Sequence, residues 1–273
     1  MSNQILVIGA HPDDAEFRAG GLTARATANG HTVKYVSMTD GSAGHHEMEP
    51  DSLAIRRCAE AASAAAVCDI EYDVRSTRDG HLRPTLEERE AVIRLMREFE
   101  PDLVLTHRPN DYHPDHRYTA QLVRDAAFMV MVPNVCADTP PLTHNPAIAY
   151  LQDDFSRPYP FDPELFVAVD PTALERKYAM IACHESQTFE WLPYLAGILD
   201  QVPSAAADRR GWLARDPLST LDAVSAAADR YRDRLREPFG PERAAAVDYV
   251  EAFELSEYGG DLSPTLMDEL FMG

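Results

Sequence analysis

The chain begins its first predicted strand at Ile5-Leu6-Val7-Ile8-Gly9 and turns directly into Ala10-His11-Pro12-Asp13-Asp14. An apolar run of four residues bounded by glycine is typical of a strand buried on both faces of a parallel sheet. The turn that follows brings one imidazole and two carboxylates close together. Because ligands bind at the carboxyl ends of the strands in an open parallel sheet, this turn predicts one half of a metal site.

Strand and helix patterns alternate from residue 5 to residue 106. The clearest helix has a capping-box signature at Thr85 and Glu88, followed by apolar side chains at helical spacing. Such alternation predicts an α/β fold, with a mostly parallel sheet and helices on both of its faces. The predicted strands are 5–8, 31–39, 70–74 and 103–105, and the predicted helices are 16–29, 51–67 and 85–99.

The second half of the chain carries weaker signals, and we interpret the whole as one domain, with a core of about 1–190 and a helical C-terminal elaboration of about 191–273. Thr172 and Glu175 repeat the capping-box spacing, which predicts a helix from there to about residue 185. The other predicted elements are a helix at 116–131, a short strand at 147–151, a strand at 166–169, surface helices within 204–236 and an amphipathic helix at 242–253.

The composition limits the partners. The formal net charge is -20, from 45 acidic and 25 basic side chains, and this excess argues against nucleic acid, whose phosphates are bound by clustered Lys and Arg. The four cysteines are scattered without a C-x-x-C pair, so we expect them to be reduced. No secretory signal or membrane-spanning run is apparent, which predicts a cytoplasmic protein.

A second polar turn follows the strand at 103–105 and reads Asp111-Tyr112-His113-Pro114-Asp115-His116. It too comes after a buried strand, so we expect the two turns to meet at one edge of the sheet. His11, Asp14 and His116 would supply two nitrogens and one oxygen, which is the three-ligand set that leaves a catalytic zinc one open position.

The remaining polar residues of the two turns have roles in catalysis under this hypothesis. Asp13 would take a proton from the zinc-activated water as general base. His113 would stabilise the oxyanion of a tetrahedral intermediate or protonate the leaving amine. Asp115 would hydrogen-bond His113 and raise its basicity.

These residues resemble the signatures of the LmbE/PIG-L family of zinc-dependent N-deacetylases. The matching motifs are the two turns, the Thr39-Asp40-Gly41-x-x-Gly44 turn, Arg56, and His184-Glu185-Ser186-Gln187, in matching order over about the first 190 residues.

The resemblance implies a Rossmann-like fold, one zinc ion, and hydrolysis of an N-acyl group, usually acetyl on an amino sugar. By motif, His11, Asp14 and His116 match the metal ligands of the family and Asp13 matches the base. His113 matches the electrophilic acid, and Asp115 matches the residue that tunes it. Arg56 matches a substrate-binding arginine. The resemblance also implies a homo-oligomer, either a trimer or a hexamer.

Two departures from the family pattern stand out. Ala15 follows the paired aspartates where many members have Glu, so Glu16 is assigned no role. Asp111 occupies the position of a tyrosine found in some members, with Tyr112 adjacent. Of the other histidines, His107 either supports the site or packs in the core.

Two other functions remain open from the sequence. One is an amidase that acts on a thiol conjugate or another N-acyl metabolite. The other is a metal-dependent protein that binds a sugar or nucleotide without hydrolysing it.

Overall fold

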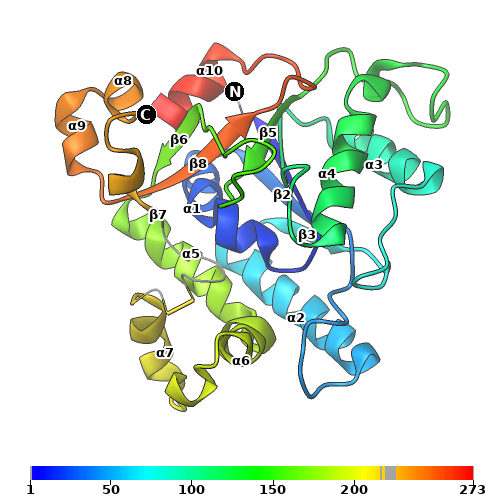
Figure 1. Cartoon of the computed structure of the whole chain (residues 1–273). Coiled ribbons are helices and arrows are strands. Elements are labelled where there is room, and N and C mark those ends of the chain that lie inside the picture. The colour runs from blue at the N-terminus through cyan, green and yellow to red at the C-terminus, as the bar shows by residue number, and fades with distance from the viewer. Residues whose placement is uncertain (1, 216, 219–225, 273) are drawn as a thin grey trace.

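The computed structural model describes residues 2–215, 217–218 and 226–272. An eight-stranded sheet runs through the molecule in the order β3-β2-β1-β4-β5-β8-β6, and β7 pairs with β8 (Figure 1). The pairs from β3 to β5 are parallel, whereas β8 runs antiparallel to its neighbours. The strands are β1 Gln4–Gly9, β2 Thr32–Ser37, β3 Glu71–Val74, β4 Leu103–Thr106, β5 Ala147–Leu151, β6 Leu165–Ala168, β7 Ala226–Ala227 and β8 Tyr249–Leu255. The predicted mostly parallel α/β fold is confirmed.

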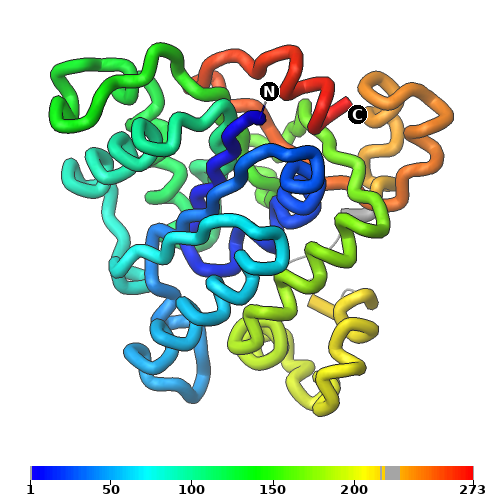
Figure 2. Tube along the Cα trace, turned by 180° about the vertical axis from the view of Figure 1, so that it is seen from behind, coloured from blue at the N-terminus to red at the C-terminus, as the bar shows by residue number. Residues whose placement is uncertain are grey.

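Helices cover both faces of the sheet, as predicted. Helices α1, α2 and α5 pack together on one face, and α3 and α4 pack together on the other (Figures 1 and 2). The longer helices are α1 Asp14–Ala28, α2 Pro50–Cys68, α3 Leu86–Phe99, α4 Pro114–Ala126, α5 Pro171–Cys183 and α7 Ala206–Leu213. The shorter ones are α6 Leu192–Leu195, α8 Arg236–Phe239, α9 Pro241–Ala246 and α10 Pro264–Leu266. A π-helical turn at Ser186–Trp191 joins α5 to α6, and a second one at Met267–Met272 follows α10.

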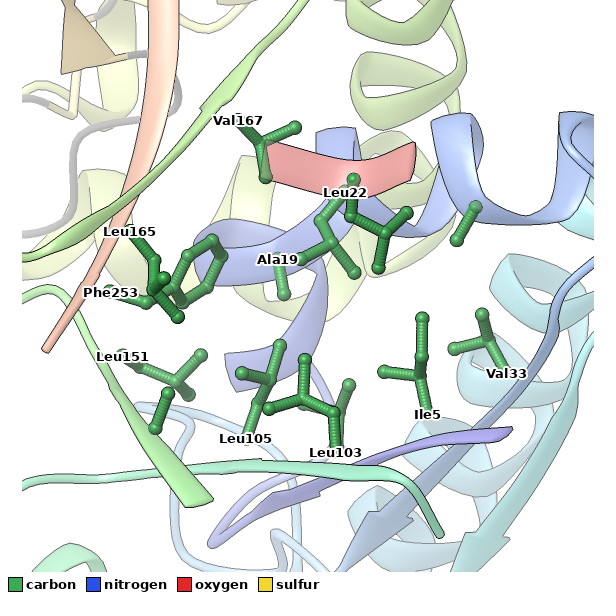
Figure 3. Close-up of a cluster of buried hydrophobic side chains, with 14 of the residues drawn as sticks. Ile5, Ala19, Leu22, Val33, Leu103, Leu105, Leu151, Leu165, Val167 and Phe253 are labelled. Carbon is green, nitrogen blue, oxygen red and sulfur yellow. The ribbon is translucent and has the colours of Figure 1, made fainter. Parts of the chain in front are cut away.

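Strand β1 lies between the two helix layers, and its side chains alternate between them. Ile5 and Val7 pack with α1 on one side, and Figure 3 shows Ile5 in this cluster with Ala19 and Leu22 of that helix. Leu6 and Ile8 pack on the other side with α3 and α4. All four are fully buried. Burial on both faces explains why β1 is a continuous apolar run rather than an alternating one.

One of the two predicted helix caps is confirmed and the other is wrong. The predicted cap at Thr85 is confirmed, because its side chain accepts a hydrogen bond from the N–H of Glu88. The predicted cap at Thr172 is wrong: Asp170 caps α5, and its Oδ1 accepts from the N–H groups of Thr172 and Ala173. Proline at the first helical position, Pro171, starts the helix directly after this aspartate.

The C-terminal part of the chain differs most from the prediction. The helix predicted at 242–253 is wrong: α9 ends at Ala246, and Tyr249–Leu255 form strand β8 between β5 and β6. The buried carboxylate of Glu251 fixes β8 in this position. It accepts hydrogen bonds from the N–H groups of Gly21 and Leu22, and it pairs with Lys177. The described residues of the segment 191–272 therefore complete the sheet rather than form only a helical elaboration.

Two further segments are shorter or more buried than predicted. The helix expected at 116–131 ends at Ala126, and a 3-10 turn follows at Phe128–Met131. Within 204–236, α7 is amphipathic rather than solvated, because Trp212 and Leu213 pack in a cluster with Phe17. Residues 216 and 219–225 of that segment lie outside the described residues. Among the described residues, no helix has the length and apolarity that a membrane span requires.

Candidate metal centre

The two polar turns meet at the carboxyl ends of β1 and β4, which are neighbouring parallel strands. His11 Nδ1 lies 3.1 Å from His116 Nε2, and His116 Nε2 lies 3.5 Å from Asp14 Oδ1. The third distance, from His11 Nδ1 to Asp14 Oδ2, is 3.8 Å. The structure thus brings the three predicted ligands within 4 Å of one another, with Oδ1 of Asp14 nearer to His116 and Oδ2 nearer to His11. Among the described residues, the groups whose donor atoms could hold an ion together are His11 with His113 and His116, Asp14 with His107 and His116, and His11 with Asp79, His113 and Asp115.

The local backbone orients Asp14. Its Oδ2 accepts hydrogen bonds from the N–H groups of Ala10 (2.8 Å) and His11 (2.7 Å), which close the turn after β1. The same oxygen lies 3.0 Å from Nε2 of His107, whose ring stacks on that of His116 with a centroid distance of 4.0 Å. Of the two readings left open for His107, the structure favours support of the site.

A carboxylate lies on the far side of each of the two histidines predicted to be ligands. Asp111 Oδ2 lies 3.0 Å from Nδ1 of His116, which leaves Nε2 of that ring for a metal. Asp79 Oδ1 lies 3.1 Å from Nε2 of His11, which leaves Nδ1. A carboxylate on the far nitrogen fixes the tautomer and the direction of a ligating imidazole. The sequence alone predicts no such role for Asp79 or Asp111.

The electrostatics of the cluster favour a cation. Burial lowers the pKa of His11, but the neighbouring carboxylates of Asp115, Asp79 and Asp14 outweigh it and raise that pKa to about 10. The charged form of Asp79 is favoured in turn, because the hydrogen bond and charge of His11 outweigh its burial and lower its pKa. Oxygen and imidazole donors in a buried, carboxylate-rich site suit a divalent ion such as zinc. The donor set therefore fits the metal that the sequence predicts.

Asp111→Asn tests the support of His116 directly. We expect its affinity for zinc to fall by about 10- to 100-fold, because an amide cannot hold the imidazole as a carboxylate does. Competition with a chromogenic chelator measures this affinity. Asp138→Asn makes the same change at an exposed residue that pairs with Arg94, and should bind zinc as the unaltered protein does. Equal affinities for all three proteins would refute the role of Asp111.

Asp13 lines the same pocket and faces a buried arginine. Its Oδ1 lies 3.0 Å from the guanidinium of Arg57, which is 2% exposed and also donates to the backbone oxygens of Gly41 and Pro12. Gly41 has a φ of +65°, and a Cβ there would lie 2.6 Å from the Arg57 guanidinium. The glycine turn predicted after the second strand therefore makes room for Arg57.

Arg56, the predicted substrate-binding arginine, points elsewhere. It does not line the pocket: its guanidinium makes two hydrogen bonds to Glu190, of 2.7 and 2.8 Å, and pairs with Glu60 at 3.0 Å. The guanidinium that reaches the pocket is that of Arg57, the next residue of α2. The prediction for Arg56 thus gains no support from the pocket geometry.

His113 lies beside the three predicted ligands. It caps α4, and its Nδ1 accepts the N–H of Asp115 at 3.2 Å. Its ring lies edge-on to that of His11, with a centroid distance of 4.5 Å. Burial, together with the neighbouring His11 and His116 rings, lowers the pKa of His113.

The carboxylate of Asp115 has other partners than the one predicted. It accepts from the N–H of Gly80 at 2.6 Å and lies 3.6 Å from Nε2 of His11. The predicted hydrogen bond from this carboxylate to His113 is therefore wrong, and only the backbone N–H of Asp115 contacts that imidazole. Asp115 instead helps Asp79 to hold His11.

A pocket of about 460 Å³ opens over this cluster. Loops that follow β1, β2, β4 and β5 line it, together with the π-helical turn at Ser186–Trp191. Beyond the residues already described, its walls carry basic, acidic and aromatic side chains: Arg18, Arg108, Asp153, Asp154, Tyr112, Phe155 and Trp191. The buried cluster is thus open to a small molecule from one side.

Comparison with known proteins identifies the family. Residues 6–127 match the family model described as PIG-L: GlcNAc-PI de-N-acetylase. The diacetylchitobiose deacetylase of Thermococcus kodakarensis is 30% identical over 210 residues, which cover 71% of this chain and 76% of that protein. The chain belongs to the PIG-L (LmbE-like) family. The resemblance seen in the sequence motifs is therefore confirmed.

The chain is also similar to a protein with another activity. A 4-oxalmesaconate hydratase of Pseudomonas putida is 23% identical over 197 residues, covering 69% of this chain and 76% of that protein. The fold is shared with the N,N'-diacetylchitobiose deacetylase from Pyrococcus horikoshii, with a TM-score of 0.69, 23% identity, and coverage of 94% of this chain and 85% of that one. Family membership alone therefore does not decide between hydrolysis and hydration.

Proposed function

We propose that this protein is a metal-dependent hydrolase that removes an N-acetyl group from a small amino sugar. The observation that carries the proposal is the meeting of His11, Asp14 and His116 in one pocket with Asp13 and His113. The deacetylase relative from Thermococcus kodakarensis supports the same class of reaction.

His11, Asp14 and His116 would hold the ion, and zinc is the metal that we propose. When bound, it supplies a Lewis acid that polarises the amide carbonyl and makes water a stronger nucleophile. The backbone N–H groups on Asp14 and the carboxylates behind the two imidazoles hold these donors in place without the ion. Little reorganisation is then needed when the metal binds.

Asp13 is the general base in this proposal. Its carboxylate lies at the pocket wall, and the buried Arg57 guanidinium holds it in one orientation. It takes a proton from the attacking water as the oxygen forms its bond to the amide carbon. The same proton is then available for the leaving nitrogen.

His113 is the proposed oxyanion stabiliser, and the leaving nitrogen takes its proton from Asp13. Because its Nδ1 accepts a backbone N–H, the proton of the neutral ring sits on Nε2. A fixed N–H donor stabilises the oxyanion of the tetrahedral intermediate more than it stabilises the ground-state carbonyl. Collapse of that intermediate breaks the C–N bond and releases acetate and the free amine.

The hydratase relative provides the alternative, in which the same base adds water to a carbon–carbon double bond. An assay for released acetate separates the two, using N-acetylglucosamine, N,N'-diacetylchitobiose and an N-acylated thiol conjugate. We expect zinc-loaded protein to release acetate from a sugar, a chelator to stop the release, and added zinc to restore it. No acetate from any substrate would refute the proposal, and loss of absorbance from a conjugated dicarboxylate would favour the hydratase.

A further inference from the structure

The residues that follow β5 form a third part of the pocket wall. Strand β4 lies between β1 and β5, and the three strands run parallel. The two polar turns follow β1 and β4, whereas the proposed hydrolysis uses nothing from the end of β5. Leu151 ends that strand, and every residue from Leu151 to Phe155 lines the pocket. Because neighbouring strands lie about 4.8 Å apart, this part of the wall is about 10 Å from the turn that follows β1.

Arg108 holds this part of the wall in place. It comes two residues after β4, and its side chain is fully buried. Its guanidinium donates to Oδ1 of Asp153 at 2.7 Å and to the backbone oxygens of Phe155 at 3.4 Å and Tyr159 at 2.8 Å. The ring of Tyr159 also lies 4.8 Å from the guanidinium carbon. A planar guanidinium with partners on several sides fixes their relative positions, so the segment after β5 is ordered without a ligand.

Gln152 lies in the middle of this ordered segment. Before it in the chain, the Tyr150 hydroxyl lies 2.9 Å from that of Ser256. After it, Asp153 Oδ1 accepts the backbone N–H of Phe155 at 3.0 Å. Gln152 itself is partly buried, and the residues on either side of it are buried. Because the chain is fixed on both sides, binding a ligand through this amide orders little more than the side chain itself.

Gln152 differs from the other polar side chains of the pocket in its hydrogen bonding. Carboxylates of the pocket pair with basic side chains: Asp13 with Arg57, Asp79 with His11, Asp111 with His116, Asp153 with Arg108 and Asp154 with Arg230. The other amide of the pocket, that of Gln187, donates to Gly44 and Ser186. Gln152, by contrast, makes no hydrogen bond within the part of the chain that the structure describes. Its two N–H groups and its oxygen are therefore available to a ligand.

We propose that the Gln152 amide hydrogen-bonds a hydroxyl of the sugar ring that carries the N-acetyl group, which makes Gln152 a residue that determines substrate specificity. This inference rests on the proposed function. An amide both donates and accepts, as a hydroxyl does, so the two groups match without a change of charge. The candidate metal centre lies at the ends of β1 and β4, and Gln152 lies one strand further on, about 5 Å away across the sheet. A single sugar ring is large enough to span this distance.

A charged group fits this part of the wall less well. Asp153 and Glu254 lie 2.7 and 3.7 Å from the Arg108 guanidinium, so its single positive charge is already balanced. An anionic substrate would therefore meet an excess of carboxylate beside Gln152. A cationic one would have to compete with Arg108 for Asp153, in a pair that is buried. A neutral hydroxyl avoids both costs.

Deoxy sugars test the proposal in the zinc-loaded enzyme. Among the 3-deoxy, 4-deoxy and 6-deoxy forms of N-acetylglucosamine, we expect one to have a KM about 10-fold above that of the parent sugar, as the loss of a neutral hydrogen-bonding partner causes. Gln152→Leu should raise the KM of the parent sugar by about 10-fold with kcat unchanged, and should bind that deoxy sugar as well as the parent. The matched control is Gln121→Leu, which changes an exposed glutamine of α4 outside the pocket lining and should match the unaltered enzyme. Equal KM values for all the sugars in the unaltered enzyme, or unchanged discrimination in Gln152→Leu, would overturn the proposal.

Calorimetry with glucosamine, the product, separates failure of this inference from failure of the proposed reaction, because binding requires no turnover. We expect Kd for the zinc-loaded protein to be about 10-fold higher in Gln152→Leu than in Gln121→Leu, with equal midpoints of thermal unfolding. Binding that depends on Gln152 without any acetate release would retain the inference and refute the hydrolase. Acetate release with equal Kd values in the two variants would overturn the inference and retain the hydrolase. Absence of glucosamine binding to the unaltered protein would also overturn the inference.

Discussion

Asp13→Asn is expected to lower kcat for acetate release by about 100- to 10,000-fold, the usual contribution of a positioned general base. The amide has the same shape as the carboxylate and can still contact Arg57, but it cannot accept the proton of the attacking water. The bound metal should remain, because Asp13 is not among the three proposed ligands. Single-turnover kinetics with metal analysis of the same sample measure both quantities.

Two controls distinguish a loss of proton transfer from a loss of folding. Thermal unfolding of Asp13→Asn checks that Arg57, which is buried, does not destabilise the fold when its anionic partner is lost. Asp138→Asn, the exposed variant used above, should keep full activity. If Asp13→Asn turns over at the rate of the unaltered enzyme, another group is the base and the proposed mechanism is wrong.

His116→Ala is expected to remove the metal itself. In the proposed site His116 is one of three ligands and lies within 4 Å of the other two, so its loss should weaken zinc binding by more than about 100-fold, beyond the effect of changing a supporting residue. Acetate release should fall with the metal content. Zinc per chain after dialysis, measured by atomic emission, gives the result.

The matched control for His116→Ala is His144→Ala, which removes an exposed imidazole outside the pocket lining. It should retain a full complement of zinc. If His116→Ala also retains it, the ion is held by another set. Among the described residues, the candidate group without His116 is His11, Asp79, His113 and Asp115, and these would be the next to change.

The parallel part of the fold is predictable because its signals are local. Strands β1 and β4 are short apolar runs, and β2 and β3 alternate apolar with polar side chains. Helix α3 carries its own amphipathic pattern and its own cap at Thr85. Strand β8 is different, since its place between β5 and β6 depends on contacts far along the chain, such as Glu251 with Gly21. The sequence around residue 250 does not indicate these distant contacts.

The meeting of the two polar turns is predictable for a similar reason, because one follows β1 and the other follows β4, which are neighbouring parallel strands. The assignment of His11, Asp14 and His116 as metal ligands stays a prediction. The arginine that lines the pocket is not predictable in this way. Consecutive residues of a helix project about 100° apart, so a difference of one position decides whether Arg56 or Arg57 faces the pocket. The contact of Asp79 with His11 is not predictable either. It depends on the backbone of the loop after β3, and the sequence of that loop does not indicate it.

The position of β8 has a consequence for how this protein is made. All the proposed catalytic and metal-binding residues are translated by His116, and the parallel strands up to β5 follow soon after. Strand β6, however, pairs only with β8 among the described strands. It therefore cannot join the sheet until β8, which ends at Leu255, has left the ribosome. The nascent chain therefore carries an unpaired edge on β5 through much of its synthesis, and that edge is where a chaperone or a second nascent chain would bind.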